Sequence, residues 1–310
     1  MKNIFLIIAL MLSSLMTKAQ HINFESNELY PEGIAYSKKL KKFFVSSIHY
    51  GKIGTVDLKG NYSEFVDDEE LVSSLGLLID EKKNLLIACV ADPGVSVKTD
   101  QSTQGKLAKL IAYHLKTGKK AYSIDLAAIN KSSGNFANDL AMDKAGNIYI
   151  TNSFSPVVFK VTAGGKASIF ATSDHWDKEG FSLNGIAFHE DGSLIVSQSN
   201  TGALYTVSLK DPKNIQKINV NEMPGADGII LSKSNELIVL SNSEKTLYKV
   251  TSNDNWQSAN IAATVPSLLS FPTTGVNVNS KNFVLNAKLN EIFDPATPNS
   301  SDYIIQEVTF

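Results

Sequence analysis

A short pattern that recurs six times along the 310-residue chain restricts its possible folds more than any other feature. Each copy begins with a residue that usually precedes glycine, and continues with two or three apolar residues, a polar turn and a β-rich run. The six copies begin at Glu32, Leu75, Asn138, Asn184, Asp227 and Thr274. Four of the five intervals are 43 to 47 residues long, and the interval from Leu75 to Asn138 is 63. A period in the forties, with short strands and glycine-rich turns, is typical of the four-stranded blade of a β-propeller.

We therefore predict an all-β fold, a six-bladed β-propeller of four-stranded antiparallel blades, formed as a single domain by residues 20–310. The long interval predicts an insertion at residues 96–106. Strand-like segments lie near both ends of the chain, at residues 22–24 and 303–310. We expect these two segments to share one blade and so to close the ring.

The charge balance and the N-terminal segment limit the partners and the location of the protein. The chain has 29 basic and 31 acidic residues, a formal net charge of −2, which argues against a nucleic-acid partner. Lys2, an apolar run over residues 4–16 and small residues up to Ala19 form the pattern of a signal peptide over residues 1–19. The mature protein would then be periplasmic or extracellular. No cysteine lies directly after the apolar run and no later segment resembles a membrane span, so we expect no membrane anchor. The sequence makes no prediction of the oligomeric state.

The first residues of the six copies are candidates for a metal site. Equivalent positions of propeller blades lie at equal distances from the axis, so these residues should form a ring at one mouth of the channel. Two carboxylates, Glu32 and Asp227, and two carboxamides, Asn138 and Asn184, would meet there. A divalent cation would offset the repulsion and the desolvation of the two carboxylates. The oxygen ligands favour Ca²⁺, with Mg²⁺, Mn²⁺ or, less well matched, Zn²⁺ as alternatives. The simpler interpretation is that the four side chains bind water and cap turns.

Four other residues are candidates for contact with a small-molecule substrate. Asp139 directly follows a proposed ligand, and Thr274 occupies the sixth position of the predicted ring. His49 follows the first repeat, and His175 lies in a loop that leads to Asn184. Both histidines could reach the mouth of the channel, although a solvated loop is the alternative for each of them.

The chain resembles the SMP-30/gluconolactonase-like family of six-bladed propellers. The likeness rests on four ordered segments: 31–33 (Pro-Glu-Gly), 136–139 (Phe-Ala-Asn-Asp), 183–187 (Leu-Asn-Gly-Ile-Ala) and 226–229 (Ala-Asp-Gly-Ile). The resemblance implies a channel-bound divalent ion with Glu32, Asn138, Asn184 and Asp227 as its ligands. It also implies that Asp227 acts as general base or nucleophile in the hydrolysis of lactones or organophosphates. Sugar lactonases of this family often have an arginine where this chain has Phe136, which favours a more apolar substrate.

Two functions remain open at this point. One is a metal-dependent hydrolase of a lactone or related ester. The other is a non-catalytic propeller, a binding or scaffold protein in which the channel ion only joins the blades. The fold by itself does not decide between them.

Overall fold

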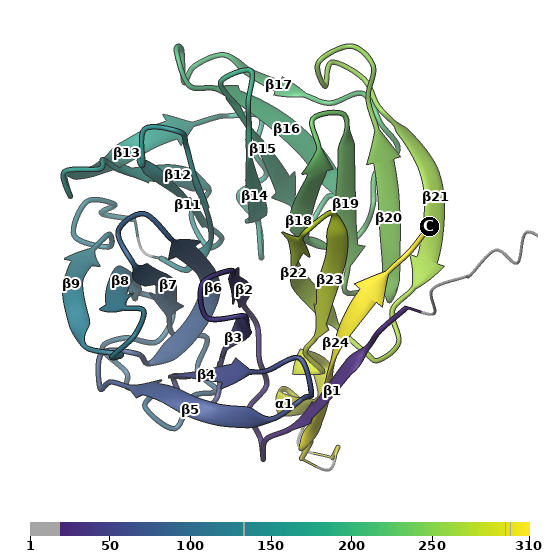
Figure 1. Cartoon of the computed structure of the whole chain (residues 1–310). Coiled ribbons are helices and arrows are strands. Elements are labelled where there is room, and N and C mark those ends of the chain that lie inside the picture. Colours follow the sequence, from purple (N-terminus) through teal and green to yellow (C-terminus); the bar gives the residue numbers. More distant parts are fainter. Residues whose placement is uncertain (1–18, 133, 295, 298) are drawn as a thin grey trace, which may run out of the picture.

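The computed structural model describes residues 19–132, 134–294, 296–297 and 299–310, and the account below concerns these residues. They form six four-stranded antiparallel sheets arranged as blades around a central channel (Figure 1). The predicted all-β, six-bladed fold is confirmed. Apart from Ala19, the predicted signal peptide at residues 1–19 lies outside the described residues. Within the described part of the chain, no helix is long and apolar enough to cross a membrane.

Each blade takes four strands that, in all but the last blade, follow one another along the chain. Blades 1 and 2 contain β2 (Ile34–Ser37), β3 (Lys42–Ser46), β4 (Lys52–Val56), β5 (Tyr62–Asp67), β6 (Ser73–Asp80), β7 (Leu85–Ala91), β8 (Ala108–His114) and β9 (Lys120–Asp125). Blades 3 and 4 contain β10 (Ala137–Met142), β11 (Ile148–Asn152), β12 (Val157–Val161), β13 (Ala167–Thr172), β14 (Leu183–His189), β15 (Ser193–Gln198), β16 (Ala203–Ser208) and β17 (Ile215–Lys217). Blade 5 contains β18 (Ala226–Lys233), β19 (Glu236–Ser241), β20 (Thr246–Thr251) and β21 (Asn260–Pro266).

Blade 6 joins the two ends of the chain, as the sequence predicts. It contains β22 (Pro272–Val278), β23 (Lys281–Asn286), β24 (Asp302–Val308) and the N-terminal β1 (Ile22–Glu25), with the short helix α1 (Leu289–Ile292) between β23 and β24. Strand β1 lies beside β24 (Figure 1) and pairs with it in antiparallel register. In this register Phe24 lies opposite Tyr303. Because β1 comes from the start of the chain and β24 from its end, this pairing closes the ring without a covalent link.

The core consists of separate apolar layers between neighbouring blades. Successive side chains of a strand point to opposite faces, so a blade between two others buries both of its faces. Strand β7 shows this most clearly, because all seven of its residues are buried. Its Leu86 and Ala88 pack toward blade 1, whereas Ile87 and Cys89 pack toward blade 3. This arrangement explains why the second strand of each repeat is a continuous apolar run.

Bulges in the inner strands place the ring residues. The pairing of β10, β14 and β18 with the next strand slips between Ala137 and Leu140, Leu183 and Ile186, and Ala226 and Ile229. Each slip spans a ring residue and the residue after it. Such a β-bulge changes the direction in which the side chains of these residues point. Glu32 differs because it lies just before β2, where the Ser46 hydroxyl accepts the N–H of Gly33 at 2.6 Å.

The sixth ring position belongs to Thr273, and the predicted assignment to Thr274 is wrong by one residue. The bulge of β22 lies between Pro272 and Gly275, so Thr273 corresponds to the ring residues of the other blades. A Cβ at Gly228 would lie 2.6 Å from the Thr273 carbonyl oxygen, just as one at Gly185 would lie 2.5 Å from that of Asp227. The error arose because Thr274 precedes a glycine, as ring residues do in four other copies. In the fold, Thr274 itself takes the place of that glycine.

The predicted insertion is the loop of residues 92–107 between β7 and β8, slightly longer than residues 96–106. The fully buried Asp92 organises this loop, because its carboxylate accepts hydrogen bonds from the Thr99 and Thr103 hydroxyls at 2.7 Å each. The loop also contacts blade 1, where the Val97 N–H donates to the His49 carbonyl oxygen at 2.9 Å. It brings Pro93 to the mouth of the channel.

Candidate metal and substrate site

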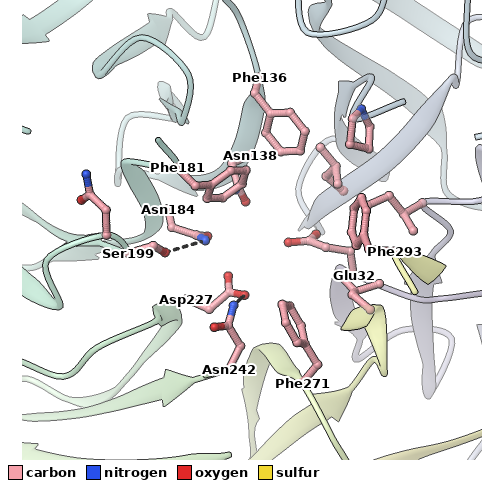
Figure 2. Close-up of a pocket in the computed structure, with 15 residues that line it drawn as sticks. Glu32, Phe136, Asn138, Phe181, Asn184, Ser199, Asp227, Asn242, Phe271 and Phe293 are labelled. Atoms are coloured by element: carbon pink, nitrogen blue, oxygen red, sulfur yellow. Dashed lines mark hydrogen bonds between the residues drawn. The ribbon is translucent and has the colours of Figure 1, made fainter. Parts of the chain in front are cut away.

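The four oxygen-bearing ring residues line one cavity of about 360 Å³ at the mouth of the channel. They come from blades 1, 3, 4 and 5, yet Figure 2 shows Glu32, Asn138, Asn184 and Asp227 pointing toward a common centre. All four are buried, with 2 to 6% of their surface exposed. The structure therefore brings together residues that lie nearly two hundred positions apart in the sequence.

Two serine hydroxyls set the orientation of the carboxamides. The Ser153 hydroxyl donates to the Leu183 carbonyl oxygen and the Ser199 hydroxyl to that of Ala226, both at 2.6 Å. Having used its proton, each hydroxyl accepts the Nδ2–H of the carboxamide beside it, Asn138 or Asn184, at 3.0 Å. The amide nitrogens thus face the serines, and the Oδ1 atoms face the common centre.

Three oxygens of the ring are buried without a hydrogen-bond partner. They are Glu32 Oε2, Asn138 Oδ1 and Asn184 Oδ1, and together they make up three of the five such side-chain atoms in the described residues. Buried acceptors without a donor are costly, and a cation among them would remove that cost. A hard divalent ion fits this set of oxygens, with Asp227 supplying the second carboxylate.

The ring is not a cluster of the commonest metal-binding residues. In the part of the chain that the structure describes, no three His, Cys, Asp or Glu side chains form a metal-binding group. The candidate site combines two carboxylates with two carboxamides instead. Such all-oxygen sets suit calcium better than zinc, which prefers nitrogen and sulfur ligands.

Burial and mutual repulsion raise the pKa values of the carboxyl groups at the channel. Burial is the main cause of the raised pKa of Glu32, and the nearby Asp227 and Asp139 add to it. Burial also raises the pKa of Asp227 to about 8, although a hydrogen bond from Asn242 works in the opposite direction. Burial raises the pKa of Asp139 to about 7, although hydrogen bonds from the N–H groups of Leu140 and Ile186 lower it. A bound cation would favour the ionised forms.

The metal-free protein should therefore lose stability as the pH rises from about 4 to about 8. The pKa of Asp227 is higher in the folded chain than in the unfolded chain, so the folded chain binds more protons in this range. The contribution of Asp227 to the free energy of unfolding is therefore fully present below its pKa in the unfolded chain, about 4. This contribution is lost as the pH rises through the pKa in the folded chain. Thermal melts in EDTA at pH 5 and pH 8 measure the effect. A higher melting temperature at pH 8 would contradict it, and saturating Ca²⁺ should reduce the difference.

The four predicted substrate contacts lie outside the lining of the cavity. Asp139 is directly beyond Asn138, where its carboxylate accepts the Leu140 N–H at 2.8 Å. His49 turns toward the loop of residues 92–107, with Nδ1 at 2.9 Å from the Val95 carbonyl oxygen. His175 lies on an exposed loop, and Thr274 stands beside the ring. The structure thus assigns none of them a place on the cavity wall.

An apolar wall forms most of the cavity above the ring (Figure 2). Loops and strands of blades 1, 2 and 6 and the segments before β10 and β14 provide its eight side chains: Ile48, Leu75, Pro93, Phe136, Phe181, Phe271, Leu289 and Phe293. A smaller polar wall, defined by Ser199, Asn200 and Asn242, comes from blades 4 and 5. Phe136, at the position where related sugar lactonases often have an arginine, is part of this wall.

Sequence reasoning did not identify Asn242, Ser153 or Ser199. Asn242 Nδ2 donates to Asp227 Oδ2 at 2.9 Å and so holds one side of that carboxylate. The serines follow β11 and β15 by one residue, each two positions after another hydroxyl residue, Thr151 or Ser197. This hydroxyl-x-serine pattern was the available signal, because both hydroxyls bond to backbone carbonyls of the next blade.

Replacing Asn242 by alanine should weaken Ca²⁺ binding about 10- to 100-fold, the usual effect of losing a group that orients a metal ligand. Asp227 would lose the hydrogen bond that opposes its raised pKa. Calorimetric titration with Ca²⁺ at pH 7 measures the affinity. Ser243→Ala is the matched control, because the Ser243 hydroxyl donates to the Pro224 carbonyl oxygen and not to the ring. Equal affinities in the two variants would rule out this role of Asn242.

Comparison with solved structures shows the same fold in proteins of low sequence identity. The major allergen Mala s 1 of Malassezia sympodialis aligns with a TM-score of 0.74 and 19% identity, over 94% of this chain and 96% of that one. A luciferin-regenerating enzyme gives 0.65 and 12%, over 93% and 97% of the two chains. A gluconolactonase from Xanthomonas campestris gives 0.62 and 14%, over 94% and 90%.

Sequence comparison identifies the family. No curated protein matches the chain. The model of the SMP-30/gluconolactonase/LRE-like region matches residues 30–277, which include all four oxygen-bearing ring residues and five of the six blades in full. The chain therefore belongs to the SMP-30/gluconolactonase/LRE-like family of six-bladed β-propellers.

Proposed function

We propose that the protein is an exported hydrolase of a lactone or related ester that depends on a divalent cation, most simply Ca²⁺. One observation carries the proposal. Three buried oxygens without partners, on Glu32, Asn138 and Asn184, face the same cavity as the carboxylate of Asp227. A bound Ca²⁺ would neutralise the two carboxylates and polarise a substrate carbonyl.

The residues of the chain would then hold and activate the reactants. Asn242 Nδ2 donates to Asp227 Oδ2 and so orients the carboxylate, and Oδ1 would take part in proton transfer. Asp227 Oδ1 would take a proton from water as the water adds to the carbonyl carbon, and would pass this proton to the alkoxy oxygen as the acyl C–O bond breaks. If Asp227 Oδ1 instead attacks that carbon directly, the alkoxy oxygen leaves with a proton from water, and a second water hydrolyses the resulting anhydride to free the acid and Asp227. The apolar wall would exclude other water from the site.

A panel of lactones, aryl esters and organophosphates, assayed with Ca²⁺ and with EDTA, tests the proposal. We expect hydrolysis of at least one lactone or ester that EDTA abolishes and Ca²⁺ restores. Thermal melts under the same conditions should show stabilisation by Ca²⁺. Stabilisation without turnover would instead support the non-catalytic propeller, in which the ion only joins the blades. An absence of both effects would remove the metal site as well.

The predicted export is tested separately. Expression of the full chain in a bacterial host, followed by fractionation and N-terminal sequencing, should yield a protein in the periplasm or the medium that begins at Gln20. A cytoplasmic product that retains residues 1–19 would contradict export.

A further inference from the structure

The cavity has an uneven distribution of polar groups. Apart from the ring itself, the polar side chains that line it in the described part of the chain come from blades 4 and 5, as the polar wall of Ser199, Asn200 and Asn242. The remaining directions are covered by the apolar wall defined above. A ligand that touches the ring therefore has hydrogen-bonding partners on one side and hydrocarbon on the others.

Aromatic packing keeps part of the apolar wall in place. The rings of Phe136 and Phe181 meet edge to face, with their centroids 5.1 Å apart. Phe154 supports both from behind, at 4.9 Å from Phe136 and 5.7 Å from Phe181. Such contacts stabilise a fixed arrangement of rings, so this surface is prepared for an apolar group before the ligand arrives.

The cavity disfavours two classes of ligand: anions, because of its charges, and highly hydroxylated molecules, because of its apolar wall. The sequence contains no arginine, and among the residues that the structure describes no lysine or histidine lines the cavity. A substrate carboxylate or phosphate would find no cationic side chain on the described walls, and the charge of a Ca²⁺ at the ring would already be balanced by Glu32 and Asp227. The hydroxyl groups of a sugar lactone would lose water against the apolar wall without gaining hydrogen bonds.

On the basis of the proposed function, we propose that the substrate is a neutral lactone or ester with an apolar substituent. Its carbonyl group lies at the four-oxygen ring. Its alkyl or aryl substituent packs against the apolar wall, with Phe136 and Phe181 as residues that determine specificity. The polar wall then faces the ring oxygen or alkoxy oxygen of the substrate.

A homologous series tests this substrate class. We would assay six-membered lactones whose alkyl side chain grows from methyl to pentyl, beside glucono-δ-lactone, which has the same ring size. Burial of a methylene group corresponds to about a fourfold change in an equilibrium constant, so kcat/KM should rise about fourfold per added methylene until the wall is covered. Glucono-δ-lactone should be the poorest substrate of the set. A flat series, or a preference for the hydroxylated lactone, would overturn the inference.

The variant Phe181→Asn locates the effect in the wall. Phe181 is only partly buried on a loop, so its replacement should leave the fold intact. The variant should reduce the rise in kcat/KM for each added methylene group from about fourfold to less than twofold. Phe170→Asn is the control, because Phe170 in β13 is also partly buried but packs on Tyr149 and does not line the cavity. A full chain-length dependence in Phe181→Asn would show that the wall does not select the substrate.

Binding measurements separate this inference from the proposed function. Six-membered lactams with the same alkyl chains are not hydrolysed, and calorimetry of their binding does not require catalysis. Tighter binding with longer chains, without turnover of any lactone, would support the apolar ligand class and reject the hydrolase. Turnover of lactones without any effect of chain length would support the hydrolase and reject the apolar substrate.

Discussion

Replacing Asp227 by asparagine should stabilise the metal-free protein and abolish its stabilisation by Ca²⁺. Without a cation, Asp227 is a buried carboxyl whose pKa burial raises to about 8, beside Glu32, whose pKa is also raised. At pH values above about 8 the native fold then holds the ionised Asp227 in an apolar environment beside a second acidic group, Glu32, which is unfavourable. The neutral amide of Asp227→Asn has almost the same shape and removes the Asp227 charge. With Ca²⁺ present, the same change removes a ligand and the group proposed to take the proton.

Thermal melts at pH 8.5 measure both effects. The variant should melt above wild type in EDTA and below it in 1 mM Ca²⁺, and hydrolysis should be lost. Glu190→Gln is a matched control, because Glu190 is an exposed carboxylate far from the ring, next to Lys144. It should melt like wild type under both conditions. An unchanged Ca²⁺-induced shift in Asp227→Asn, or turnover close to that of wild type, would show that Asp227 is not a ligand or not catalytic.

Replacing Gly185 by alanine should destabilise the protein by about 3 kcal/mol or more, as expected when a rigid, fully packed site receives an additional atom. The new Cβ would lie 2.5 Å from the Asp227 carbonyl oxygen and 2.8 Å from the Gly228 Cα. Both atoms belong to the backbone, so no side chain can move aside. The change would force blades 4 and 5 apart and displace Asn184 and Asp227 from the common centre.

Urea unfolding at pH 7 measures the loss of stability, and calcium titration of the folded fraction measures the loss of affinity. The control is Gly164→Ala, on an exposed turn where the nearest atom to the new Cβ is 3.9 Å away. That change should alter the free energy of unfolding by no more than about 0.5 kcal/mol. If Gly185→Ala is equally mild, the blades do not approach as closely as the structure shows.

The features that follow the repeat could be predicted from the sequence. The repeat determines which residues occupy equivalent positions, and it correctly brought Glu32, Asn138, Asn184 and Asp227 together. The repeat gave the wrong residue in the sixth copy. Thr274 precedes a glycine, as most ring residues do, but the bulge of β22 places Thr273 at the ring position. Closure by β1 and β24 was also predictable, because a propeller must pair its outer edges and both ends read as strands.

The features that depend on loops and on contacts between blades could not be predicted in this way. Phe293 reaches the cavity from the segment after α1, which belongs to blade 6 alone and does not recur with the repeat. Asn242 does occupy a repeated position, fifteen residues after its ring residue like Ser153 and Ser199, but it carries a carboxamide where those blades carry a hydroxyl. The sequence positions of His49 and His175 favour the mouth of the channel, but a hydrogen bond between His49 Nδ1 and the Val95 carbonyl oxygen turns that ring toward the loop of residues 92–107. Side-chain direction in loops is set by such local bonds, which a repeat pattern does not contain.

A crystal structure of the protein grown with Ca²⁺ tests the central claim most directly, with anomalous scattering to locate the ion. The account predicts one calcium peak in the channel, with Glu32, Asn138, Asn184 and Asp227 oxygens at about 2.3–2.6 Å. Waters or substrate would supply its remaining ligands. A channel without a calcium peak at saturating Ca²⁺, or a peak that lies out of reach of these four side chains, would contradict it.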